Sequence, residues 1–271
     1  MPELPEVETS RRGIEPHILN KTVSDVIVRQ KQLRWPITAS LKKQLIGQVI
    51  RQVERRGKYI LLSTDAGTVI LHLGMSGSLR ILPPSIPAEK HDHFDIVFSH
   101  KKILRLRDPR RFGAVLWTKS DPLKHKLLVN LGPEPLTEDF TAEYLFKQSR
   151  NRKVAIKTFL MNSHIVVGVG NIYANESLFS AGINPKRAAG NISLTRYKKL
   201  VPAIKSILTH SIEQGGTTLK DFINENGKPG YFQQTLNVYG RATEACINCG
   251  AAIKKITQTQ RATFYCSQCQ K

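Results

Sequence analysis

The fold of the N-terminal half is decided by Lys58-Tyr59-Ile60-Leu61-Leu62-Ser63-Thr64-Asp65-Ala66-Gly67-Thr68-Val69-Ile70-Leu71-His72-Leu73. Two short aliphatic runs flank the turn signal Asp65-Ala66-Gly67, which is typical of a β-hairpin. Similar strand-like runs cover residues 22–28, 94–98 and 102–106. Because no long helix separates them, residues from about 23 to 117 are expected to form an antiparallel sandwich or barrel.

Helical patterns surround this strand-rich region. One helix is expected near the N-terminus, with Pro5 at its start and Pro16 loosening its end, and a short one at 41–45. A proline-rich linker at 121–135 is followed by expected helices at 142–148, 154–161, 171–180 and 194–214. Pro202 predicts a kink or break in the last helix. The expected class is α+β, with domains at 1–130, 131–240 and 241–271.

The charge balance points to a polyanionic partner. The 271 residues include 41 Lys+Arg against 21 Asp+Glu, a formal net charge of +20. Basic residues are scattered through folded-looking sequence, which favours nucleic acid over an anionic membrane surface. A merely basic protein is the alternative. No apolar run approaches the roughly 18 residues of a membrane span, and the acidic N-terminus lacks a signal peptide's basic start. A cytoplasmic location is therefore expected.

All four cysteines lie in two C-x-x-C pairs near the C-terminus, namely Cys246, Cys249, Cys266 and Cys269. Four thiolates from two short turns suit one tetrahedral structural Zn²⁺. The alternative of two disulfides requires an oxidising compartment, and no targeting segment indicates one. Lys254, Lys255 and Arg261 lie between the pairs without any acid. The interpretation is a zinc ribbon with a nucleic-acid-binding face, with a purely structural clip as the alternative.

The N-terminus offers a candidate nucleophile. Methionine is normally removed before a small residue such as Pro2, which would leave a secondary amine beside Glu3. The pKa of an N-terminal amine is about 7.7–8 and that of lysine about 10.4, so the amine is partly neutral near pH 7. Its attack on a sugar carbon would give an iminium. The alternative is that these residues only begin a helix. If Met1 remained, Pro2 would have no free amine.

Several motifs, taken together and in one order, are highly specific. They are residues 1–8 (MPELPEVE), 56–59 (RGKY), 72–77 (HLGMSG), 108–113 (DPRRFG), 168–173 (GVGNIY) and the four-cysteine tail. From residue 2 to residue 271 the chain resembles the bacterial formamidopyrimidine-DNA glycosylase family. The resemblance implies an N-terminal antiparallel β-sandwich, a helical domain with a helix–two-turn–helix element and a C-terminal zinc ribbon. It also implies removal of oxidised purines, such as 8-oxoguanine and formamidopyrimidines, from double-stranded DNA, followed by β- and δ-elimination at the abasic site.

The resemblance also assigns roles to individual residues. The catalytic set that it implies is Pro2 as nucleophile, Glu3 as proton donor, Lys58 and Arg261. Glu6 is expected to steady the site or guide the flipped nucleotide. The residues expected to fill the void left by the flipped base are Met75, Arg110 and Phe112. The residues expected to grip the DNA backbone are His91, Arg110, Lys153, Asn171 and Arg261. Residues 217–231 resemble a loop that closes over the extruded base.

Two other functions compete with this interpretation. A sister glycosylase for oxidised pyrimidines shares the Pro-Glu start, the helical element and the ribbon, but residues 4–8 and 108–113 favour the purine enzyme. A non-enzymatic zinc-ribbon DNA-binding protein would use the N-terminus only structurally. The 168–171 turn suits a phosphate but is also a common interhelical turn. A monomer is expected.

Overall fold

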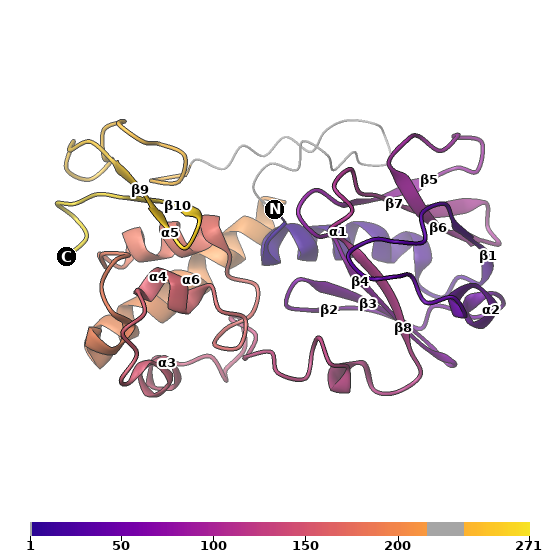
Figure 1. Ribbon diagram of the computed structural model, residues 1–271, viewed down its shortest axis with the longest axis horizontal. Coiled ribbons are helices and arrows are strands. Elements are labelled where there is room, and N and C mark those ends of the chain that lie inside the picture. Colours follow the sequence, from indigo (N-terminus) through magenta and orange to yellow (C-terminus); the bar gives the residue numbers. More distant parts are fainter. Residues whose placement is uncertain (1, 216–235) are drawn as a thin grey trace. The chain divides into compact units, whose positions relative to one another are not determined.

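The computed structural model describes residues 2–215 and 236–271, coloured along the chain in Figure 1. They divide into two units, one with residues 2–129 and 215 and the other with residues 130–214 and 236–271. Each unit has a hydrophobic core of its own. Met1 and the expected loop at 217–231 lie outside the described residues.

The first unit is built on two four-stranded sheets in which every neighbouring pair of strands is antiparallel. One sheet has the order β1 (Val23–Val28), β6 (Asp92–Phe98), β7 (Lys102–Arg107), β5 (Ser78–Leu82). The other has the order β2 (Gln52–Arg56), β3 (Tyr59–Thr64), β4 (Gly67–His72), β8 (Ala114–Thr118). Side chains from both sheets share one core, so the expected sandwich is confirmed. Thr64 pairs with Gly67, which confirms the predicted hairpin.

Two helices belong to the same unit. α1 (Leu4–Ile18) buries Leu4, Val7, Ile14 and Ile18, whose spacing places them on one face. The helix continues two residues past Pro16, which the sequence placed at its loosened end. α2 (Leu41–Leu45) is the predicted short helix, and Gly47 follows it at φ +83°. Pro2 therefore lies two residues before the start of a helix that is packed on the sandwich.

The second unit is helical and ends in a hairpin. The 3-10 turn η1 (Pro122–Lys124) lies in the connection before it. Its elements are α3 (Ala142–Ser149), α4 (Ile156–Leu160), α5 (Asn171–Ser180), η2 (Ala189–Asn191), α6 (Leu194–Glu213), β9 (Lys254–Gln258) and β10 (Arg261–Tyr265). The hairpin of β9 and β10 lies beside α5 (Figure 1). The expected α+β class, with sandwich, helical region and cysteine-rich ribbon, is thus confirmed.

Two sequence-based predictions for the helices need correction. The helix expected at 154–161 is α4, which begins only at Ile156, because Ala155 is extended and bridges Ala188. Of the kink or break expected at Pro202, the break is absent, since α6 runs unbroken over 20 residues. Pro202 lies on the exposed face, where water can satisfy the carbonyl that proline leaves without a donor.

None of the helices within residues 2–215 and 236–271 is both long enough and apolar enough to cross a membrane. α6 has the length, but four basic side chains interrupt it, at Arg196, Lys198, Lys199 and Lys205. Its apolar residues instead pack in the core of the second unit.

Candidate active site

The start of α1 gathers three residues of the predicted site. Pro2 is buried, and Glu3 and Glu6 are only 2% and 3% exposed. The Glu3 N–H donates to Glu6 Oε2 at 2.8 Å, as part of a capping box at the helix start. Glu6 therefore has the helix-starting role that the sequence offered as the alternative, because its carboxylate fixes the backbone of Glu3. The same hydrogen bond holds Glu3 in place next to Pro2.

Lys58 occupies a two-residue hairpin loop between β2 and β3. Arg56 and Tyr59 pair across the base of this loop, and Gly57 adopts φ +57°, a conformation that such tight loops require. The Lys58 side chain is half-buried. Lys58 is therefore carried by the tight end of a hairpin of the sandwich and not by a long surface loop.

His72 is a residue of this region that the sequence reasoning left without a role. It pairs with Tyr59 across the sheet, and their ring centroids are 4.7 Å apart. Burial, together with the charges of Lys58 and Arg34, lowers the pKa of His72 to about 4. The ring is thus neutral at pH 7, and because Nδ1 accepts the Gly74 N–H at 3.0 Å, the proton sits on Nε2. The sequence feature that could have indicated a role for His72 is its position as a titratable residue directly before the glycine-rich turn at 73–77.

Two loops extend from neighbouring strand ends and carry the predicted void-filling residues. β4 and β8 pair at His72 and Ala114, so the Met75 loop (73–77) and the Phe112 loop (108–113) start side by side. Met75 and Phe112 are 38% and 42% exposed, so neither belongs to the core. Arg110 lies over the Phe112 ring, 5.0 Å from its centroid. One guanidinium and two apolar side chains are therefore available on the surface to contact a partner.

The two loops are locked together at their bases. The Asp108 carboxylate, which is fully buried, accepts the Gly113 N–H at 2.7 Å and the Ser76 hydroxyl at 3.2 Å. A Cβ on Gly74 would lie 2.4 Å from the Phe112 carbonyl carbon, so the backbones meet where no side chain fits. The His91 carbonyl accepts the Asp108 N–H, which joins the half-buried His91 to the same frame.

In the second unit, polar side chains of α4 and α5 grip the β10 strand. Asn171 Nδ2 and Lys157 Nζ both donate to the Ala262 carbonyl, at 3.1 and 2.9 Å. Asn175 Oδ1 accepts the Phe264 N–H at 2.8 Å. These bonds bring the predicted residue Asn171 next to β10, whose first residue is the exposed Arg261. Sequence alone could not place two residues 90 positions apart in this way.

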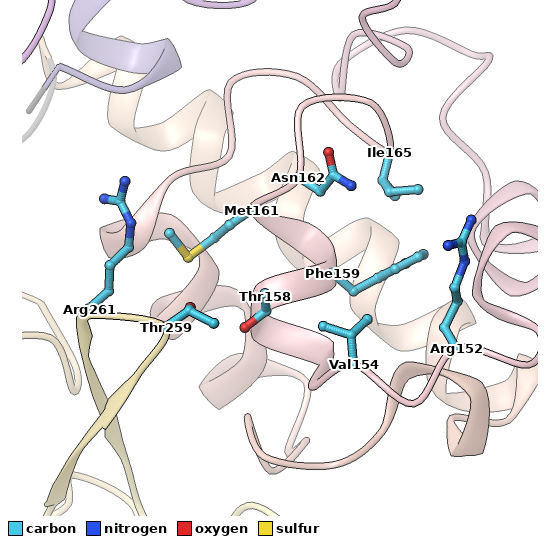
Figure 2. Close-up of a pocket in the computed structure, with 9 residues that line it drawn as sticks. All are labelled: Arg152, Val154, Thr158, Phe159, Met161, Asn162, Ile165, Thr259 and Arg261. Carbon is cyan, nitrogen blue, oxygen red and sulfur yellow. The ribbon is translucent and has the colours of Figure 1, made fainter.

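A cavity of about 430 Å³ opens beside the same hairpin (Figure 2). Arg261 and Arg152 stand at opposite ends, and Phe159 and Met161 of the α4 region lie between them. Lys153 adjoins Arg152 and is exposed. The surface is therefore basic at both ends of an apolar floor, which suits an anionic and partly apolar ligand.

The four cysteines form a metal site in the same unit. All four Sγ atoms lie within 4.8 Å of one another. The distances are 3.8 Å for Cys246–Cys269 and 3.5 Å for Cys249–Cys266, close to the edge of about 3.8 Å that Zn–S bonds of about 2.3 Å give a tetrahedron. These residues hold one structural Zn²⁺, and none of the four thiols is in a disulfide.

Comparison with known proteins gives consistent matches along the chain. Family models match at residues 1–115 (formamidopyrimidine-DNA glycosylase N-terminal domain), 131–223 (formamidopyrimidine-DNA glycosylase H2TH domain) and 244–271 (zinc finger found in FPG and IleRS). The formamidopyrimidine-DNA glycosylases of Photobacterium profundum and Shewanella halifaxensis are 60% and 58% identical over 271 residues, covering 100% of both chains.

Solved structures agree with these matches. A Lactococcus lactis FPG mutant in complex with Fapy-dG-containing DNA has a TM-score of 0.92 at 34% identity, with 100% of both chains covered. The MutM (FPG) protein of Thermus thermophilus has a TM-score of 0.87 at 33% identity, covering 99% of this chain and 98% of its own.

Proposed function

Because the chain belongs to the formamidopyrimidine-DNA glycosylase family, we propose that Pro2 is the nucleophile with which it excises oxidised purines from duplex DNA. The resemblance drawn from the motifs is confirmed, and with it a glycosylase and abasic-site lyase of base-excision repair. The observation that carries the residue assignment is the buried Pro2-Glu3 start of α1.

The chemistry then follows from a secondary amine next to a carboxyl group. The Pro2 nitrogen attacks C1′ of the deoxyribose as the C1′–N bond to the base breaks. Glu3 donates the proton that opens the sugar ring, and the C1′–nitrogen linkage becomes an iminium. The iminium acidifies C2′–H, so loss of that proton expels the 3′ phosphate. A second elimination expels the 5′ phosphate, and hydrolysis then returns the free amine.

Lys58 and His72 fit the phosphate side of this chemistry. Lys58 supplies an ammonium at the hairpin loop. His72 stays neutral at pH 7 and keeps its Nε2–H as a hydrogen-bond donor. A neutral donor beside a cation suits a phosphate oxygen, because it adds a hydrogen bond without a second positive charge that Lys58 would repel.

The Met75 and Phe112 loops suit a duplex from which one nucleotide has been extruded. The base must leave the stack before its sugar can be attacked, and the vacated space needs filling. Met75 and Phe112 supply apolar surface, and Arg110 supplies a planar donor for the cytosine left unpaired.

The remaining predicted contacts grip the phosphate backbone. His91, Lys153, Asn171 and Arg261 provide charge and donors without reading sequence, as a search for scattered damage requires. Within the second unit, the cavity between Arg152 and Arg261 adds to the basic surface around Lys153. We assign the limits 1–130, 131–240 and 241–271 to the sandwich, helical domain and ribbon. The protein acts as a monomer on chromosomal DNA in the cytoplasm.

The test is borohydride trapping on duplex DNA with 8-oxoguanine opposite cytosine, followed by intact and peptide mass. An adduct on Pro2 is expected, and Pro2→Gly should lose most excision and trapping. With Met1 confirmed absent, an adduct on another residue, or unchanged excision by Pro2→Gly, would refute the assignment. Excision of thymine glycol in preference to 8-oxoguanine would instead favour the pyrimidine enzyme.

A further inference from the structure

We propose that Arg55 is a positioning residue, which fixes the Lys58 loop against the helix that follows the nucleophile. This inference rests on the proposed function, since it concerns how Pro2 and Lys58 are held for one reaction. Arg55 belongs to β2, three residues before Lys58, and only 12% of its side chain is exposed.

Arg55 joins two elements through one rigid group. Its Nε donates to Glu8 Oε2 of α1 at 3.0 Å, and its Nη1 donates to the Gly57 carbonyl at 2.9 Å. Gly57 is the first residue of the two-residue loop, and Lys58 is the second. Because a guanidinium is planar, these two bonds fix the loop carbonyl relative to the α1 carboxylate.

The α1 end of this link is itself firmly anchored. The Glu8 carboxylate, with a side chain 11% exposed, also accepts from Arg11 and Arg12. Burial alone would raise the pKa of Glu8, but its bonds to Arg11 and Arg12 lower it, so the acid is ionised at neutral pH. Arg11 in addition donates to the Val53 carbonyl of β2 at 3.0 Å. Helix and strand are therefore joined at two points.

This arrangement matters because Pro2 and Lys58 arrive on separate elements. The nucleophile precedes α1, whereas Lys58 lies at the end of the β2–β3 hairpin, so their separation depends on contacts between these two elements. The Glu8–Arg55–Gly57 chain is such a contact, and it reaches the loop that carries Lys58. Small errors in such placement are costly, since a displacement of about 1 Å can lower a rate about a hundredfold.

The test compares Arg55→Met with Arg12→Met. Arg12 bonds to the same Glu8, but its side chain is 57% exposed and this bond does not reach the Lys58 loop. Single-turnover cleavage at a preformed abasic site should fall about a hundredfold in Arg55→Met, with DNA affinity and zinc content unchanged. Arg12→Met should retain the wild-type rate. A wild-type rate in Arg55→Met would overturn the inference.

A double-variant cycle separates positioning from a general loss of structure. If Arg55 acts through Lys58, Arg55→Met should slow Lys58→Ala no further, whereas independent effects would multiply and overturn the inference. Arg55→Lys keeps a charge beside Glu8 but cannot bond both Glu8 and the Gly57 carbonyl through one planar group. This variant provides the test if Arg55→Met does not fold. It should remain slow, and a wild-type rate would overturn the inference. Failure of the wild type to trap DNA at Pro2 would instead refute the proposed function.

Discussion

Replacing Asp108 with Ala should loosen the Phe112 loop from the Met75 loop without removing any side chain proposed to contact DNA. The Asp108 carboxylate is fully buried and bonds to Gly113 N and Ser76 Oγ, one partner in each loop. Asp108→Ala removes both bonds. Asp108→Asn keeps an oxygen for the Gly113 N–H and offers an N–H to the Ser76 hydroxyl, which can also accept.

The expected cost follows from these contacts. A buried N–H that loses its acceptor costs about 1–3 kcal/mol, and the hydroxyl bond contributes about 1 kcal/mol. Asp108→Ala should therefore destabilise the paired loops by about 2–4 kcal/mol. Asp108→Asn loses only the charge of the acceptor, which corresponds to about 1 kcal/mol.

The assay compares excision of 8-oxoguanine from a duplex with strand cleavage at a preformed abasic site. In the proposed role the two loops open the stack together, so Asp108→Ala should slow excision about thirtyfold for about 2 kcal/mol, while abasic-site cleavage falls much less. Asp108→Asn should be slowed a fewfold. Ser76→Ala, which removes the hydroxyl bond alone, is the matched control and should behave like Asp108→Asn. Equal slowing on both substrates, or equal effects of Asn and Ala, would refute this account of the loops.

Three further predictions concern the tip of the Met75 loop, the ribbon and the buried imidazole. Met75→Ala should impair excision from duplex DNA much more than cleavage at a preformed abasic site; equal losses would count against a void-filling role. Cys249→Ser should lower zinc content and DNA affinity together, measured by metal analysis and DNA titration, and stoichiometric zinc would contradict the site. His72 should titrate near pH 4 by NMR. Because its folded pKa lies below the unfolded value of about 6.5, stability should fall as pH drops from about 6.5 towards 4, and His72→Gln should weaken that fall.

Local patterns carried most of the fold. The alternation around the 65–67 turn and the apolar spacing of α1 were decisive because each feature lies within one element. β2 was not among the predicted strands, because Gln52-Val53-Glu54-Arg55-Arg56 is mostly polar. Only its pairing with β3 makes it a strand. The late start of α4 likewise depends on Ala188, which lies 33 residues away. Tertiary pairing overrode propensity in both places.

The residues of the candidate site likewise fall into those that local sequence predicted and those that depend on tertiary contacts. The Pro-Glu start and the cysteine pairs were readable because their chemistry is local in sequence. The contact of Asn171 with β10, the neutrality of His72 and the bond of Arg55 to Glu8 were not, since each depends on a partner from another element. Charge counts identified a polyanion as partner, but they could not distinguish Arg55, which is bonded inside the protein, from the exposed Arg261.

The close approach of Gly74 to the Phe112 backbone fixes the base of the two loops through backbone atoms, without using the side chains at their tips. Substitutions at the base of the loops are therefore limited by space, and substitutions at the tips are not limited in that way. A side chain at position 74 would clash with the Phe112 backbone, whereas the Met75 side chain is 38% exposed. A small environment-sensitive fluorophore attached at position 75 should leave the frame intact. If position 75 enters the base stack as proposed, the emission should change when the labelled protein opens a base pair of duplex DNA.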